Sequence, residues 1–150
     1  MALKERLQTD LTAAMKSRDE LRSATIRMAL TAITNEEVSG KQARVLSDDE
    51  VLTVLTREAK KRREAAEAFD GAGRAELAAR ERAEGEVLSD YLPAQLSDEE
   101  LVELVQTAIA ETGADNRKAM GQVMKVLQPQ VTGRADGGRV AAEVRRQLGA

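Results

Sequence analysis

The sequence contains no cysteine and no histidine. Without cysteine the chain forms no disulfide and offers no thiol nucleophile, which is natural for a protein of a reducing compartment. Without histidine it lacks the usual general base near neutral pH and the commonest metal ligand. Serine–histidine and cysteine–histidine catalysis and histidine–zinc sites are therefore excluded. We expect no metal and no cofactor.

Aromatic residues are almost absent, since Phe69 and Tyr91 are the only two. Proteins that read single-stranded nucleic acids stack the bases on several aromatic side chains, so that class of binder is disfavoured. The sequence also has no apolar run of the length of a transmembrane helix or a signal peptide. We therefore expect no membrane association and a cytoplasmic location.

Apolar residues recur with helical spacing along the whole chain, which predicts an all-α protein. Residues 47–50 and 97–100 both read Ser-Asp-(Asp or Glu)-Glu, the form of a capping box, and predict helices that begin there. In the second helix, Leu21, Met28 and Ala32, with Ala24 nearby, lie on one side, which we expect to be its apolar face. The seven expected helices cover approximately residues 3–17, 21–39, 48–69, 74–92, 98–112, 116–128 and 137–148, the sixth ending before Pro129.

Residues 91–96, Tyr-Leu-Pro-Ala-Gln-Leu, separate four of these helices from the other three. Proline has no amide hydrogen and restricts the residue before it, so the segment is typical of a linker. We place a domain boundary there. It divides the chain into an N-terminal four-helix domain, residues 1–92, and a C-terminal three-helix bundle, residues 93–150.

Basic residues are concentrated at the C-terminal end of a chain whose net charge is −3. Residues 94–116 contain acidic residues and no basic ones, whereas residues 117–150 contain seven basic residues and two acidic ones. Helical spacing predicts that Lys118 and Lys125 face outward on the sixth helix, and Arg139 and Arg146 on the seventh. With Arg134 in the corner between these helices, they form a candidate RNA-binding surface. Ordinary solvated helix faces are the alternative.

The corner itself, residues 133–137, reads Gly-Arg-Ala-Asp-Gly. We expect Gly133 and Gly137 to serve mainly the turn, and Asp136 to cap the seventh helix. Because the Asp136 carboxylate would occupy the amides at the helix start, a phosphate is expected to bind to arginine and lysine side chains instead.

In the N-terminal domain, the helical stripes place Arg62 on an inward face, opposite Glu81 and Glu84 of the next helix. Inward carboxylate pairs can hold metal ions, but such sites normally use histidine as well. We predict an inter-helix ion pair between Arg62 and one of the two glutamates, which would set the register of two alanine-rich helices.

Three segments together resemble the GatB/YqeY family: LPAQLSDEEL at residues 92–101, MGQVMK at 120–125 and GRADG at 133–137. Their order is similar to that in the tail domain of the B subunit of tRNA-dependent amidotransferases. Those enzymes convert Glu-tRNA(Gln) or Asp-tRNA(Asn) to the amide form. The resemblance extends upstream through KKRREAA at residues 60–66, so it covers essentially the whole chain, as in a stand-alone YqeY-like protein.

The resemblance implies a helical module that contacts tRNA but lacks catalytic residues. Nothing in the chain matches the kinase-like part of the amidotransferase, a phosphate-binding loop or the serine–lysine chemistry of its glutaminase partner. We expect a non-catalytic accessory tRNA-binding module, with tRNA and an amidotransferase or aminoacyl-tRNA synthetase as partners. The alternatives are a carbon–nitrogen ligase with glutamine as amido-N-donor, by family association, and a protein–protein adaptor for the translation machinery.

Overall fold

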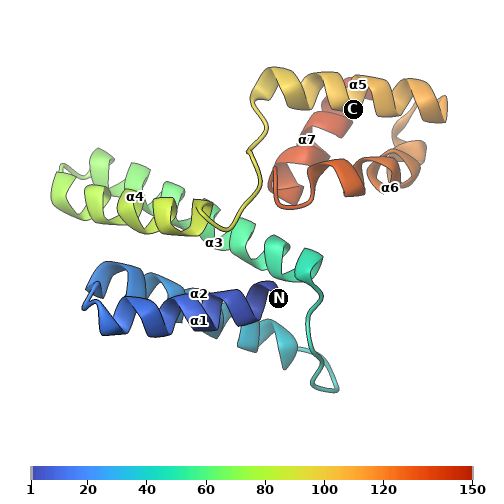
Figure 1. Cartoon of the computed structure of the whole chain (residues 1–150). Helices are drawn as coiled ribbons and strands as arrows, with labels where there is room; N and C mark the ends of the chain where they lie inside the picture. Colours follow the sequence, from blue (N-terminus) through green and yellow to red (C-terminus); the bar gives the residue numbers. More distant parts are fainter. Residues whose placement is uncertain (1, 150) are drawn as a thin grey trace. The chain divides into compact units, whose positions relative to one another are not determined.

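The computed structural model describes residues 2–149, and within this range the chain is all-α, as predicted (Figure 1). It has seven α-helices, one 3-10 turn and no strand in the part described. The elements are α1 (Leu3–Lys16), α2 (Glu20–Glu37), α3 (Asp48–Gly71), α4 (Ala75–Ser89), α5 (Asp98–Thr112), η1 (Arg117–Ala119), α6 (Met120–Val131) and α7 (Gly137–Gln147).

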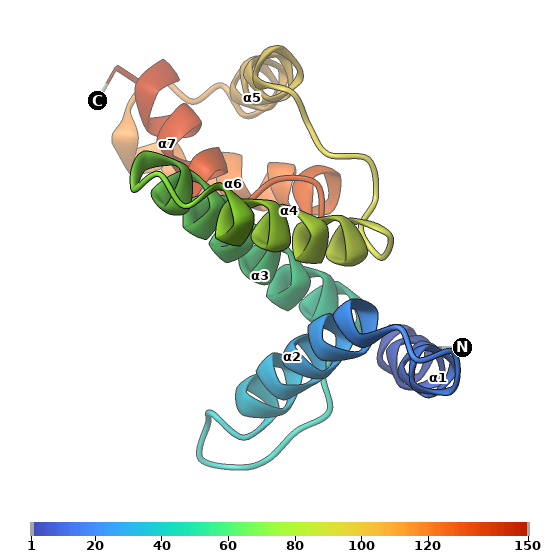
Figure 2. The same ribbon diagram turned by 90° about the vertical axis from the view of Figure 1, so that its left-hand side faces the viewer.

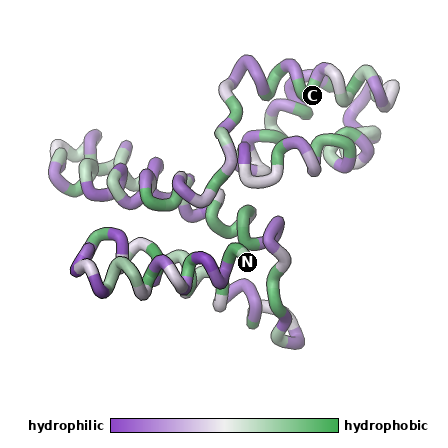
Figure 3. Tube along the Cα trace, in the orientation of Figure 1, coloured by the Kyte–Doolittle hydropathy of each residue, from purple (hydrophilic) through white to green (hydrophobic). Residues whose placement is uncertain are grey.

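The helices gather into two compact units, the N-terminal unit (Met1–Leu92) and the C-terminal unit (Pro93–Ala150). Each unit has its own hydrophobic core. Hydropathy changes within every helical turn (Figure 3), so that most helices bury one stripe of side chains and expose the rest. Between residues 2 and 149, no helix is both long and apolar enough to cross a membrane.

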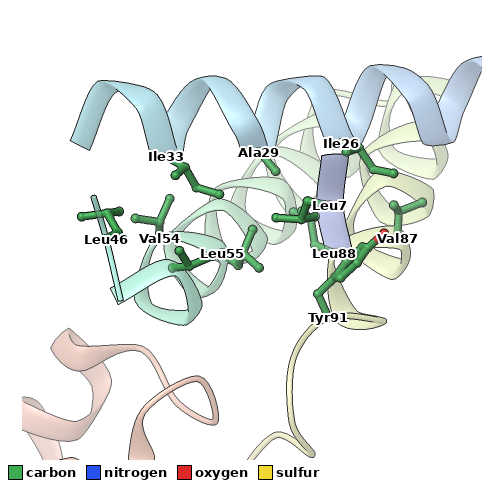
Figure 4. Close-up of a cluster of buried hydrophobic side chains, with 11 residues drawn as sticks. Leu7, Ile26, Ala29, Ile33, Leu46, Val54, Leu55, Val87, Leu88 and Tyr91 are labelled. Atoms are coloured by element: carbon green, nitrogen blue, oxygen red, sulfur yellow. The ribbon is translucent and has the colours of Figure 1, made fainter. Parts of the chain in front are cut away.

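The N-terminal unit consists of two helical hairpins, α1–α2 and α3–α4, with α2 packed against the other three helices (Figures 1 and 2). Leu7 of α1 is completely buried beside Leu88 of α4 and below α2 (Figure 4). The core members, which come from all four helices and the α2–α3 loop, are Leu7, Ile26, Ala29, Ile33, Leu46, Val51, Val54, Leu55, Val87, Leu88 and Tyr91.

The predicted inner face of α2 was wrong by part of a turn. Ile26, Ala29 and Ile33 are buried, whereas the predicted Leu21, Met28 and Ala32 are only partly buried at the edge of that face. Because α2 contacts three helices, its buried surface is wider than the single stripe that a surface helix shows, and periodicity alone does not select its centre.

Helix starts follow the prediction more closely than helix ends. Ser47 and Ser97 form complete capping boxes with Glu50 and Glu100. The predicted stop before Pro129 was wrong, because α6 continues to Val131 with the proline inside it. The proline lacks the amide that would bond the carbonyl four residues earlier, so α6 continues through it with one backbone hydrogen bond fewer.

An ion pair joins α3 to α4, as predicted. The Arg62 Nε atom lies 3.4 Å from Glu81 Oε2, and Arg62 Nη1 lies 3.4 Å from Glu84 Oε2. The Arg62 Nε and Glu81 Oε2 atoms are buried and, despite their separation, do not align as a hydrogen bond. Glu84 is 7% exposed and also pairs with Arg80 at 3.3 Å. The α3–α4 hairpin therefore contains a partly dehydrated charge cluster.

Replacing Arg62 with alanine should strongly destabilise the N-terminal unit, because two largely buried carboxylates then lose their cation. We expect the free energy of unfolding to fall by about 3 kcal/mol. Arg57→Ala on the same helix removes an exposed pair with Glu36 and should cost less than about 1 kcal/mol. Urea unfolding followed by the fluorescence of Tyr91, the only tyrosine, reports on this unit. Equal effects of the two substitutions would contradict the structural role of Arg62.

Tyr91 links the end of α4 to α1. The side chain is buried, its hydroxyl donates a hydrogen bond of 2.5 Å to Asp10 Oδ2, and the Arg6 guanidinium lies 4.8 Å from the ring centroid. Burial, followed by the neighbouring Asp10 carboxylate, raises the pKa of Tyr91 to about 12. The contact secures the last residues of the N-terminal unit to its first helix.

The ionisation of Tyr91 should therefore begin only at unusually high pH. Since its folded-state pKa is raised, the stability linked to its neutral form is present below pH ~10 and is lost as the pH rises toward about 12. Absorbance of tyrosinate gives the titration without interference from other tyrosines. Asp10→Asn should lower the midpoint, because the repelling carboxylate is gone. A midpoint near pH 10 in the folded protein would contradict the burial and the hydrogen bond.

Candidate nucleic-acid interface

The C-terminal unit surrounds a core to which each of its three helices contributes aliphatic side chains. Its buried members are Leu96, Leu101, Val105, Ala108, Val123, Leu127, Val131, Ala135, Val140 and Val144. Gly113 ends α5 in the left-handed conformation, with φ 68°, and the Asn116 side chain caps the short turn η1. Gly113 thus ends α5 and Asn116 begins η1, and α6 and α7 pack on the core with their polar faces toward solvent.

The corner between α6 and α7 depends on one glycine and one cap. Gly133 has φ 75°, a conformation that favours glycine, and the Asp136 carboxylate accepts a hydrogen bond of 3.1 Å from the Arg139 amide. The prediction for Asp136 is therefore confirmed. Gly137 differs from the expectation, because it has no positive φ and an added Cβ would meet nothing within 4 Å.

Two of the predicted RNA-binding arginines bind the chain's own backbone. The Arg134 Nε atom donates to the Ala94 carbonyl at 3.0 Å, and Arg139 Nη1 donates to the Leu96 carbonyl at 3.0 Å. A second nitrogen of Arg139 pairs with Asp98 at 2.7 Å. Both arginines thereby connect the corner to the segment that precedes α5.

Backbone and amide groups complete the same connection. The Leu96 amide donates to the Arg134 carbonyl at 2.9 Å, and the Gln95 side chain donates to the Gly133 carbonyl at 2.8 Å. We call these contacts, together with those of the two arginine side chains, the corner clamp. It brings the segment at residues 94–98 against the corner at residues 133–139, so that two of the three motifs quoted above lie on each other.

The surroundings of Arg134 are also unfavourable for a phosphate. Arg134 lines a hollow of about 260 Å³ together with Glu100 and Glu103 of α5. Capping by Ser97, with a smaller contribution from Arg134, holds the pKa of Glu100 below its usual value, so this carboxylate is charged at neutral pH. An anion that approached Arg134 from this side would meet negative charge.

Arg146 is likewise engaged, but at the surface. Its guanidinium pairs with Glu143 one turn earlier in α7, at 2.6 Å. The hydrogen bond from Arg146 holds the pKa of the Glu143 carboxyl below its usual value. The pair is exposed on the arginine side, so a polyanion competes with Glu143 for this guanidinium.

Lys118 and Lys125 are the two predicted residues that are both exposed and outside ion-pair contact with any carboxylate of residues 2–149. No acidic residue occurs in the sequence from Arg117 to Ala135. The structure places Lys118 in η1, directly before α6, and we call the exposed line through Lys118, Gln122 and Lys125 the α6 face. The structure thus divides the five predicted cations into two that hold the fold, one that is paired at the surface and two that are available on the α6 face.

The candidate RNA-binding surface predicted from the sequence did not include two further basic residues of the C-terminal unit. Arg117 and Arg145 are exposed and form no ion pair with the carboxylates of residues 2–149. The charge count of the C-terminal segment included both, but no spacing argument gave their orientation. The same described range has no group of three or more acidic residues that could hold a metal ion.

Loss of the corner clamp should destabilise the C-terminal unit. Arg139→Ala removes a charged hydrogen bond to the Leu96 carbonyl and the pair with Asp98, and should cost about 2 kcal/mol. Arg146→Ala removes an exposed pair only and should cost less than about 1 kcal/mol. Hydrogen exchange of the amides of α5 and α7 in the full chain measures both effects. Equal protection in the two variants would rule out the clamp as a stabilising contact.

Comparisons with known proteins give a single family. A family model described as Yqey-like protein matches residues 4–148. The chain is 29% identical over 149 residues to Altered inheritance of mitochondria protein 41, mitochondrial, of Pyrenophora tritici-repentis, covering 97% of this chain and 80% of that protein. It is 30% identical over 129 residues to the protein of the same name in Clavispora lusitaniae, covering 84% and 74%. An uncharacterized protein of Schizosaccharomyces pombe is 34% identical over 92 residues, which is 61% of this chain and 73% of that protein.

Proposed function

The chain belongs to the YqeY-like family, and from this membership we propose that it is a non-catalytic accessory tRNA-binding module associated with tRNA-dependent amidotransfer. The observation that carries the proposal is the α6 face, where Lys118 and Lys125 are exposed on a stretch without carboxylates. Unpaired cations on a face of one sign favour the phosphate backbone of a nucleic acid. The resemblance to the amidotransferase tail domain supports tRNA as that nucleic acid.

Binding without catalysis is the form of the proposal that the residues support best. The chain has no histidine or cysteine, and the perturbed carboxyl groups serve as helix caps and ion pairs in which they are already engaged. A carbon–nitrogen ligase that takes the amide from glutamine is the alternative by family association. Release of ammonia from glutamine by the purified protein would favour that alternative over the binding module.

We also propose that the protein acts in the cytoplasm, with an amidotransferase or an aminoacyl-tRNA synthetase as its protein partner. The composition without cysteine supports a reducing compartment. Two of the three fungal relatives above are named as mitochondrial proteins. Fractionation of cells that express the tagged chain distinguishes the two locations.

The α6 face is tested by reversing its charge. Lys118→Glu combined with Lys125→Glu should weaken tRNA binding by roughly tenfold or more, and should lower the slope of log affinity against log salt by about one for each lysine. The matched control is Lys16→Glu with Lys41→Glu. These lysines are exposed in the N-terminal unit, and the net charge changes by the same amount. Gel-shift titrations at several salt concentrations give both quantities.

The control decides between a site and a general charge effect. If both double variants lose the same affinity, the tRNA is attracted by net charge and the α6 face has no special role. If the unaltered protein shows no salt-dependent affinity for tRNA, the proposed function itself is wrong.

An adaptor for the translation machinery is the second candidate. It is favoured by a groove of about 520 Å³ between α2 and α3. Met28, Ala32 and Val54 line this groove together with polar residues of both helices. Flexible methionine side chains suit surfaces that bind other proteins. Co-purification of a synthetase or amidotransferase that survives nuclease treatment would favour the adaptor over the tRNA-binding module.

A further inference from the structure

Nothing in the structure of the C-terminal unit requires residue 121 of α6 to be a glycine. Gly121 is the second residue of α6, and glycine is among the residues with the lowest helix propensity. An added Cβ at this position would meet nothing within 4 Å, and the backbone does not have the positive φ that calls for glycine. Neither packing nor conformation within the unit therefore requires a glycine here.

The position of Gly121 beside Lys118 and Lys125 offers an explanation for the glycine. Lys118 lies in η1, and Gly121 and Lys125 lie in α6, which follows η1 directly. The three residues are separated by three and four positions, so they lie on one side of this continuous helical stretch. All three are exposed, and the two lysines are about 10 Å apart along the axis. On the α6 face, Gly121 therefore leaves the backbone bare on one side of the line that joins the two lysines, and Gln122 lies on the other side.

Bare backbone at Gly121 beside two cations suits a sugar–phosphate backbone. Glycine is used where another backbone must approach closely, because even a methyl group would keep it away by about the length of one carbon–carbon bond. Lysine side chains on either side can then reach phosphates without bending away from the helix. The stretch from Arg117 to Ala135 has no carboxylate that would repel them.

The surface also limits the kind of RNA. The C-terminal unit contains no aromatic residue, since Phe69 and Tyr91 both belong to the N-terminal unit. Bases of a single strand therefore find no stacking platform on it, whereas a folded helical RNA offers its backbone directly.

We infer that α6 rests on the backbone of a helical segment of RNA at Gly121, with Lys118 and Lys125 on phosphates at either side, and that the corner arginines take no part in this contact. The inference rests on the proposed function and adds the contact point and the preference for double-stranded RNA.

Gly121→Ala in the full chain tests the contact point. The added methyl group clashes with nothing inside the unit and favours the helix, so hydrogen-exchange protection of α6 should stay the same or increase. The affinity for a labelled tRNA(Gln) transcript, measured by fluorescence anisotropy at fixed salt, should nevertheless fall about tenfold or more. Stability and affinity thus change in different directions, which a purely structural glycine would not produce.

Gly137→Ala is the matched control. Gly137 lies in the same unit, is exposed in a helix and has equally open space around an added Cβ, but it belongs to the corner. Its replacement should leave the affinity for the tRNA unchanged. In competition experiments with the unaltered protein, a short RNA duplex should displace the tRNA at much lower concentration than oligouridine of the same length.

The outcomes separate the inference from the proposed function. Unaltered tRNA affinity in Gly121→Ala, or an equal loss in Gly137→Ala, would overturn the contact point while tRNA binding by the protein stands. Loss of protection together with affinity in Gly121→Ala would overturn it too, because the glycine would then be structural. Oligouridine that competes as well as the duplex would overturn the preference for helical RNA. A protein that binds no tRNA at all would overturn both proposals.

Discussion

The corner clamp is the contact on which the C-terminal unit depends. Its helices have 15, 12 and 11 residues, lengths at which an isolated helix is marginal in water. They are stable only when packed on one another, and the clamp connects the segment before α5 to the corner before α7. Arg134 and Arg139 suit this task because a guanidinium presents several donors in a fixed plane and can satisfy backbone carbonyls that the loops leave free.

The clamp also decides which cations remain for a partner. The guanidinium groups of Arg134 and Arg139 donate to the carbonyls of Ala94 and Leu96. A polyanion could bind these donors only if those hydrogen bonds were broken. Lys118 in η1 and Lys125 in α6 lie on a stretch without acidic residues and keep their charge accessible. The unit therefore separates two roles of basic residues in space, stabilisation at the corner and an accessible charge on α6. In the proposed function, a surface of this kind recognises a backbone by its shape and charge, since the C-terminal unit has no aromatic group to stack on bases.

The N-terminal unit uses buried polar contacts for a related reason. Many of its helical positions are alanine, whose small side chain leaves the relative register of two helices weakly specified. Arg62 holds α3 to α4 through Glu81 and Glu84, and the Tyr91 hydroxyl holds the end of α4 to α1. The ion pair was predictable because helical spacing places all three charges on facing stripes. The contact between Tyr91 and Asp10 could not be predicted, because the two residues are 81 positions apart and helical spacing does not relate the end of α4 to α1.

The all-α class, the two capping boxes and the facing charges of α3 and α4 could be predicted from the sequence, because each depends on local spacing along individual helices. Only the tertiary structure decided which face of α2 is buried, how far α6 continues past Pro129 and where Arg134 and Arg139 point. Those features depend on how many neighbours a helix has and on carbonyls some forty residues away. Local spacing predicts that a charged side chain points away from the core. It does not predict whether that side chain contacts solvent or another part of the same chain.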